Sequence, residues 1–151
     1  MFTEAILEKG PVAEISTQDS NKAIVLASFD RWKSGNGGPF ELLVPDAEWT
    51  IVGSSPLSKT YHSRKEFIDE VGGPFDARMS KPPVRTVRGI YADGDMVIIR
   101  FDIDATGRDG QPYRNAYTWY LEMKDGRVVK ATAFFDTRVF DEFWTRVSPK
   151  P

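Results

Sequence analysis

The 151-residue chain has no cysteine and only one histidine, His62. The absence of cysteine excludes disulfides, thiolate nucleophiles and thiolate metal ligands. One histidine is too few for a multi-histidine zinc site within a subunit, and any nucleophile, histidine and acid arrangement would depend on His62. The sequence therefore predicts a protein without a bound metal or cofactor.

Long apolar runs and a strong charge of one sign are also missing. The formal net charge is −2 and the pI is about 5.5, with lysines and arginines scattered among acids, which is unlike a nucleic-acid-binding surface. No stretch is long and apolar enough to span a bilayer, and the start, "MFTEAILEKG", lacks the basic leader and apolar run of a secretory signal. We expect a cytoplasmic protein that binds neither nucleic acid nor membrane.

What the chain does contain is typical of one globular domain. Hydrophobic residues make up 40% and charged residues 28% of a length that suits a single core. There is no internal repeat. We expect one domain over residues 1–151, with a core at about 20–147, a helix or arm at 1–19 and a short tail at 148–151.

The first half of the sequence predicts two helices and a short strand. Residues 20–38 carry apolar side chains at helical spacing and end in glycines. Residues 63–73 repeat the pattern at shorter length, with Ser63 and Glu66 spaced as a capping box and Gly72 as the terminator. The segment at 48–53 between them is predicted to be a strand.

The second half predicts two β-hairpins and a closing helix. Four runs rich in β-branched and aromatic residues flank the turn sequences "DGD" and "KDG", at 84–92, 96–105, 113–123 and 127–136. Residues 137–147 then carry an apolar stripe at helical spacing. Helices followed by consecutive strands favour an α+β domain with helices laid on one sheet.

This order of elements resembles the nuclear transport factor 2-like superfamily, also called SnoaL-like or ketosteroid isomerase-like. The segments most similar to it are "PDAEWTIVGSSPLSKTYHSRKEFIDEV" and "YRNAYTWYLEMKDGRVVKATAFFDT". The resemblance implies a cone-shaped α+β barrel of cystatin-like architecture, in which a curved mixed or antiparallel sheet wraps around helices. It also implies a homodimer, with the outer face of the sheet as the candidate surface.

A cone of this kind encloses a cavity suited to a small, mostly apolar ligand. The candidate substrate-binding residues are Trp49, Asn115, Tyr117, Trp119, Phe134, Phe29 and His62. The aromatic residues among them have an alternative role, because strands that pack on a helix also favour aromatic side chains. His62, which precedes a predicted helix, is either a pocket residue or an ordinary solvated loop residue.

The polar residues of the strand at 96–105 share one face. Alternation places Arg100 and Asp102 together, opposite an apolar set that includes Phe101 and Ile103. This polar face is either the solvent-facing side of an antiparallel sheet or part of a pocket. A one-residue bulge in this strand would reverse part of the pattern.

Arg100 and Asp102 together with Asp136 resemble the Arg, Asp, Asp triad of limonene epoxide hydrolases. The resemblance implies that Asp136 activates water, Arg100 holds and polarises the pair, and Asp102 donates the proton. Two carboxylates on one arginine can hold different protonation states in a dry pocket. Asp136 also begins the predicted helix at 137–147, so it is equally suited to be an N-cap.

Ketosteroid isomerases provide a second enzyme comparison with a poorer match. The position of their tyrosine donor falls at Phe29, whose ring donates no hydrogen bond. The sequence thus predicts a small-molecule-binding protein of the SnoaL-like type, with a cofactor-independent hydrolase or isomerase as its catalytic form. The alternative is a non-catalytic ligand-binding or protein-interaction module of the same fold.

Overall fold

A six-stranded sheet in the order β2-β1-β6-β5-β4-β3 forms the frame of the structure, a computed structural model that describes residues 16–151. The strands are β1 (Leu43–Ile51), β2 (Thr60–Tyr61), β3 (Val84–Asp93), β4 (Met96–Thr106), β5 (Pro112–Lys124) and β6 (Arg127–Phe135). All neighbours are antiparallel except β1 and β6, which run parallel. The sheet is therefore mixed, and the predicted α+β class and both hairpins are confirmed.

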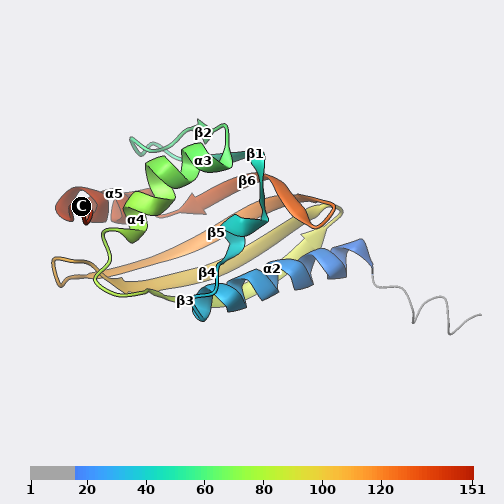
Figure 1. The fold of residues 1–151 in the computed structure, drawn as a ribbon, viewed down its shortest axis with the longest axis horizontal. Coiled ribbons are helices and arrows are strands. Elements are labelled where there is room, and N and C mark those ends of the chain that lie inside the picture. Colours follow the sequence, from blue (N-terminus) through green and yellow to red (C-terminus); the bar gives the residue numbers. More distant parts are fainter. Residues whose placement is uncertain (1–15) are drawn as a thin grey trace, which may run out of the picture.

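Helices lie against this sheet at separate places along it. They are α2 (Thr17–Lys33), the 3₁₀ turn η1 (Pro39–Leu42), α3 (Arg64–Phe67), the π-helical η2 (Ile68–Gly72), α4 (Gly73–Asp76) and α5 (Thr137–Arg146). Figure 1 shows α2 running along the strands, with α3, α4 and α5 gathered toward the other end of the molecule. Contacts join α2 to β3 and β4, α3 to β1 and β2, and α5 to β5.

The first helix begins earlier than the sequence predicts. Ser16 caps α2, because its hydroxyl accepts a hydrogen bond from the Asp19 amide at 3.1 Å. The helix therefore includes Thr17 to Asp19, which belong to the helix or arm predicted at 1–19. The rest of that predicted arm, residues 1–15, lies outside the described residues.

The second helical segment starts as predicted and ends later. The Ser63 hydroxyl accepts from the Glu66 amide at 2.9 Å, as expected for a capping box. The predicted end at Gly72 is wrong, because one π turn carries the chain through Gly72 and Gly73 into α4, which extends to Asp76. The glycines leave room for this wider turn, and the extension brings Phe75 and Asp76 over the sheet.

The core lies on one face of the sheet, beneath the helices. Along β4 and β5 alternate residues are buried, including Ile99, Phe101, Ile103, Tyr117 and Trp119. The ladder between β4 and β5 is regular from Met96 to Thr106. No bulge interrupts β4 in this ladder, so its alternation is kept, and the irregularity lies on β3, between Val87 and Gly89.

Candidate functional site

An apolar cavity of about 60 Å³ lies between the inner face of the sheet and the α3 to α4 segment. Every major element contributes to its wall: Trp32, Phe40, Trp49, Ile51, Phe67, Val71, Gly72, Phe75, Asp76, Arg85, Ile103, Tyr117, Trp119, Ala133, Phe135 and Phe140. One water molecule needs about 10 to 15 Å³ by a comparable measure. A ligand larger than a few waters therefore requires the aromatic lining to move.

The apolar wall is built from aromatic rings that pack on each other. Trp49 of β1 stacks on Phe67 of α3 at 4.4 Å between ring centroids, and it meets Trp119 of β5 edge-on at 4.9 Å. Phe40 lies 5.5 Å from Trp49 and also contacts Trp32 at 5.5 Å. Such edge-to-face and stacked pairs stabilise the wall beyond the area that they bury.

Arg85 is the one cationic residue in this wall. Its side chain is only 9% exposed, and its guanidinium carbon lies 3.5 Å from the ring centroid of Trp32. The buried Nε atom has no hydrogen-bond partner within residues 16–151. Burial lowers the pKa of Arg85 to about 10, although Asp76 works against this change. The group therefore stays charged at neutral pH, and its Nε–H is a free donor beside an apolar cavity.

Asp76 lies at the end of α4, with its Oδ1 atom 4.0 Å from Nη2 of Arg85. Burial raises the pKa of the Asp76 carboxyl, and the neighbouring Arg85 offsets part of the rise. The side chain is nevertheless 58% exposed, so its carboxylate keeps access to water. Asp76 and Arg85 thus form a loose pair at the cavity wall, in which the carboxyl can exchange a proton with solvent.

Three residues of β5 form a buried polar chain beside the cavity. The Tyr113 and Tyr117 hydroxyls lie 2.6 Å apart, and Nδ2 of Asn115 donates to the Tyr113 hydroxyl at 2.8 Å. Burial raises the pKa of Tyr113 to about 12 and holds that of Tyr117 well above its usual value. Both tyrosines are therefore neutral hydroxyl donors near pH 7.

Arg100 and Asp102 lie on the other face of the sheet. Arg100 is exposed, and Asp102 accepts from Nε of Arg88 on β3 at 2.8 Å. The hypothesis that these two residues share a pocket with Asp136 is corrected by this placement, because the regular alternation of β4 turns Phe101 and Ile103 inward instead. The solvent-facing alternative describes this strand.

Asp136 is the N-cap of α5. Its Oδ1 accepts from the amides of Arg138 and Val139 at 3.0 and 3.2 Å, and the residue is exposed. Its backbone carbonyl accepts from Nδ2 of Asn115, which links the cap to the tyrosine chain. The carboxylate itself does not line the cavity. The sequence expectation of a cap describes this residue, and the Arg, Asp, Asp triad does not form within the described chain.

The predicted substrate-binding residues divide into two groups. Trp49, Tyr117 and Trp119 line the cavity. Phe29 packs behind the wall against Trp119 at 5.7 Å, and Asn115 reaches the cavity only through Tyr113 and Tyr117.

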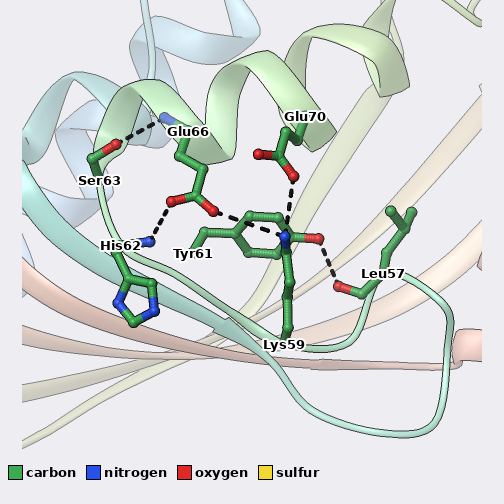
Figure 2. A network of polar contacts seen from close by, with 7 residues as sticks. All are labelled: Leu57, Lys59, Tyr61, His62, Ser63, Glu66 and Glu70. Atoms are coloured by element: carbon green, nitrogen blue, oxygen red, sulfur yellow. Dashed lines mark hydrogen bonds and ion pairs between the residues drawn. The ribbon is translucent and has the colours of Figure 1, made fainter.

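Phe134 and His62 lie away from the cavity. Phe134 is 43% exposed on the outer face of the sheet, which corrects its predicted place in the pocket. Figure 2 shows the His62 amide held by Glu66, with the imidazole ring turned away from Glu66. That ring is 70% exposed and its Nδ1 lies 3.3 Å from Glu48, so His62 is a solvated loop residue.

Arg85 and Asp76 were not among the predicted site residues, although the sequence carries a signal for one of them. In "VRTVRGIYA" strict alternation places Arg85 on the same side as Val87. An arginine in the apolar register of a strand is unusual and marks a buried cation. Asp76 gives no such signal, because its position depends on the π turn that prolongs the helix past Gly72.

The described residues 16–151 contain no group of three or more His, Cys, Asp or Glu side chains arranged to hold a metal ion. None of the helices in the same range is long and apolar enough to cross a membrane.

Comparison with known proteins places this chain among proteins of the same shape. Residues 25–131 match the SnoaL-like domain family. No curated protein matches the sequence. A nuclear transport factor 2-like protein of Burkholderia thailandensis is 20% identical, with 82% of this chain and 95% of that chain covered and a TM-score of 0.67.

Two further solved structures have the same fold. A candidate SnoaL-like polyketide cyclase of Jannaschia sp. CCS1 is 15% identical, with 84% and 92% of the two chains covered and a TM-score of 0.68. TerC, crystallised with polyporic acid, is 20% identical, with 83% and 98% covered and a TM-score of 0.65. At these identities the likeness establishes the fold alone.

Proposed function

Because the chain belongs to the SnoaL-like domain family, we propose that it binds a small, largely apolar molecule in the cavity beneath α3 and α4. The supporting observation is the composition of the wall, in which aromatic and aliphatic side chains surround a few polar groups, chiefly Asp76, Arg85 and the Tyr117 hydroxyl. Ligand sites typically combine an apolar lining with a small number of placed polar groups. Trp49, Trp119 and Tyr117 are the proposed contact residues.

The catalytic form of this proposal is acid–base chemistry on the bound molecule without a cofactor. Asp76 is the proposed proton-transfer group, and Arg85 stabilises negative charge that develops on the substrate. The support is that burial raises the pKa of the Asp76 carboxyl above its usual value, while Arg85 lies 4.0 Å away. Asp76 and Arg85 are thus proposed for the acid–base roles that the resemblance to limonene epoxide hydrolases implies for Asp136, Asp102 and Arg100.

Binding can be measured through the protein's own tryptophans. Three of the four, Trp32, Trp49 and Trp119, line the cavity, whereas Trp144 of α5 stacks on Arg78. A titration with nitrobenzene, a small apolar quencher, should give saturable quenching. Ala133→Leu, which fills the cavity from β6, should abolish the saturable part.

Ala116→Leu provides the matched control, because Ala116 is exposed on the outer face of β5. This variant should bind nitrobenzene like the wild type. Equal saturable quenching in Ala133→Leu, with circular dichroism unchanged in both variants, would contradict binding in the cavity.

We also propose that the protein forms a homodimer through the outer face of the sheet. Tyr91, Ile98 and Tyr120 occupy matching positions on β3, β4 and β5, and Tyr120 packs on Phe134 of β6 at 5.6 Å. Tyr91 and Phe134 are 50% and 43% exposed. This apolar stripe crosses four strands, and a contiguous exposed apolar patch often marks an interaction surface.

Light scattering tests the dimer directly. Phe134→Asp places a charge in the stripe and should give a monomer, while Val84→Asp, at an exposed apolar position outside the stripe, should leave the dimer intact. A wild-type protein that stays monomeric at all concentrations would rule the dimer out.

A further inference from the structure

Two of the hydrogen-bond donors in the cavity wall, on Arg85 and Tyr117, have no acceptor in the described chain. The first is Nε of Arg85, which is buried and unpartnered within residues 16–151. Trp32 covers one face of the guanidinium, so the group is fixed in place by stacking. A buried donor without an acceptor costs about 1 to 3 kcal/mol, and more when it is charged. Such a cost is recovered when a ligand supplies the acceptor.

The second donor is the Tyr117 hydroxyl, and its direction follows from Asn115. Oδ1 of Asn115 accepts from the amides of Ala116 and Asp136 at 2.8 and 3.2 Å, which fixes the orientation of the side-chain amide. Nδ2 must then be the donor to the Tyr113 hydroxyl at 2.8 Å. The Tyr113 oxygen therefore already accepts one hydrogen bond.

The proton of Tyr113 has only one available acceptor within the described residues, the Tyr117 oxygen at 2.6 Å. If Tyr117 donated instead, the Tyr113 proton would be left unpaired on a side chain that is 1% exposed. Tyr113 therefore donates to Tyr117. The Tyr117 hydroxyl keeps its own proton for a group in the cavity that it lines.

We propose that the cavity holds an anionic oxygen of a small apolar compound, a phenolate, enolate or carboxylate oxygen, between Nε of Arg85 and the Tyr117 hydroxyl. This inference rests on the proposed function, since it names the chemical class of the ligand for the same cavity. Arg85 provides the positive charge and a donor, and Tyr117 provides a second donor. The aromatic wall then holds the apolar body of the ligand.

Both donors line the same cavity, Arg85 from β3 and Tyr117 from β5. The positive charge of Arg85 also lowers the pKa of Tyr117, against the larger effect of burial. Hydrogen bonds to charged groups contribute about 1.5 to 3 kcal/mol each. Asp76 works in the opposite direction, because its carboxylate lies 4.0 Å from Arg85 and repels a bound anion.

The experiment uses the full chain and the probe 4-nitrophenol, whose anion absorbs visible light, alongside the neutral nitrobenzene. The site should bind the phenolate about tenfold or more tightly than nitrobenzene, which corresponds to one charge-assisted hydrogen bond. Binding should also lower the apparent pKa of the probe. Benzoate in competition separates a carboxylate from a phenolate as the preferred anion.

Variants assign the preference to the two donors. Arg85→Met should remove the preference for the anion and leave nitrobenzene binding, and Tyr117→Phe should weaken phenolate binding by a smaller factor. Asp76→Asn should strengthen phenolate binding. The matched control is Arg88→Met, on the outer face of the same strand, which should change neither probe.

The outcomes separate this inference from the proposed function. If nitrobenzene binds but the phenolate and benzoate bind no more tightly, the anion site is wrong and the apolar cavity stands. If Arg85→Met keeps the full preference, the anion site is also wrong. If none of the probes binds the wild type, both proposals fail.

Discussion

Two arginines of β3, only three residues apart, lie in opposite environments. Arg85 points to the inner face, stacks on Trp32 and leaves Nε without an acceptor in the described chain. Arg88 points to the outer face, where its Nε donates to Asp102 at 2.8 Å and its side chain is 55% exposed. The Nε of Arg88 thus has a hydrogen-bond acceptor on the outer face, and the Nε of Arg85 on the inner face has none in the described chain.

The difference between Arg85 and Arg88 indicates which of the two belongs to a functional site. Exposed ion pairs contribute about 0 to 1 kcal/mol, so the pairing of Arg88 with Asp102 is ordinary surface chemistry. Retaining a buried cation with an unpaired donor is costly, and such groups concentrate at functional sites. Matched residues on the two faces of the sheet should therefore respond differently to the same kind of substitution.

The largest difference is expected between Trp119 and Tyr120, neighbours on β5. Trp119→Ala removes a buried side chain that contacts Trp49, Phe101 and Phe29, and it should lower the free energy of unfolding by about 3 to 5 kcal/mol. Tyr120→Ala loses one cross-strand aromatic pair on the outer face and should cost about 1 kcal/mol or less in the monomer at low protein concentration. Urea denaturation of both variants measures the difference.

Circular dichroism of the two variants should show that both still fold before the free energies are compared. Equal losses in the two would mean that the outer face is buried as deeply as the inner face, as happens when a second copy covers it. Repeating the measurement across protein concentrations separates that case, because dimer stability depends on concentration.

The elements of the fold follow from local patterns in the sequence. Ser63 and Glu66 are predicted as a cap because the hydroxyl and the amide three residues on are within reach in any helix start. The two hairpins follow from short Asp-Gly turns between β-rich runs, and positive φ at Asp125 and Gly126 shows why those residue types are needed there. These signals depend on residues that are close together in the sequence, so they can be recognised without the tertiary structure.

The site depends on arrangements that such signals do not contain. The alternation of β4 separates Arg100 and Asp102 from Phe101 and Ile103, but it does not state which set faces the helices. The two charges in "RFD" predict a site on β4, whereas the cavity is marked by one arginine in the apolar register of β3. Asp76 reaches it only because the helix passes Gly72 through a π turn.

Arg85 lowers the stability of the folded protein, because its side chain is buried and its Nε has no acceptor in the described chain. Replacement by Met keeps the stem and removes the buried charge, so Arg85→Met should raise the free energy of unfolding by about 1 to 2 kcal/mol at pH 7. This gain should be constant below pH 10, because Arg85 is protonated in both the folded and unfolded states there. Chemical denaturation at several pH values measures it.

The gain should shrink as the pH rises above about 10. The pKa of Arg85 is lowered from 12.5 to about 10 in the folded protein. The unfolded chain therefore binds more protons between these values, and the wild type regains stability as the pH rises. The buried tyrosines also lose stability over this range, and the loss is larger in Arg85→Met, because Arg85 lowers the pKa of Tyr117 in the wild type. Both effects narrow the difference between the two proteins as the pH rises. A gain that is independent of pH would contradict this account.

A smaller effect is expected at Asp136, where helix capping and catalysis make opposite predictions. Asp136→Ala removes the acceptor of two amides and should cost about 1 kcal/mol. Asp136→Asn keeps the acceptor oxygen and should restore most of that stability. Probe binding should be unchanged in both variants, because the carboxylate lies outside the cavity wall. If Asp136→Asn is as stable as the wild type but loses probe binding or turnover, Asp136 takes part in the functional site.

The smallest effect is expected for Arg88→Met, which breaks the pair with Asp102. Both partners are half exposed, with side-chain exposures of 55% and 42%, so water replaces the lost hydrogen bond on either group. The free energy of unfolding should change by about 0.5 kcal/mol or less. Arg85→Met removes a buried donor, whereas Arg88→Met removes a solvated one. The two variants carry the same substitution and differ in the face of β3 on which it lies. If Arg88→Met cost as much as a core change, the outer face would itself have to be covered, and the dimer interface would then include Arg88 and Asp102.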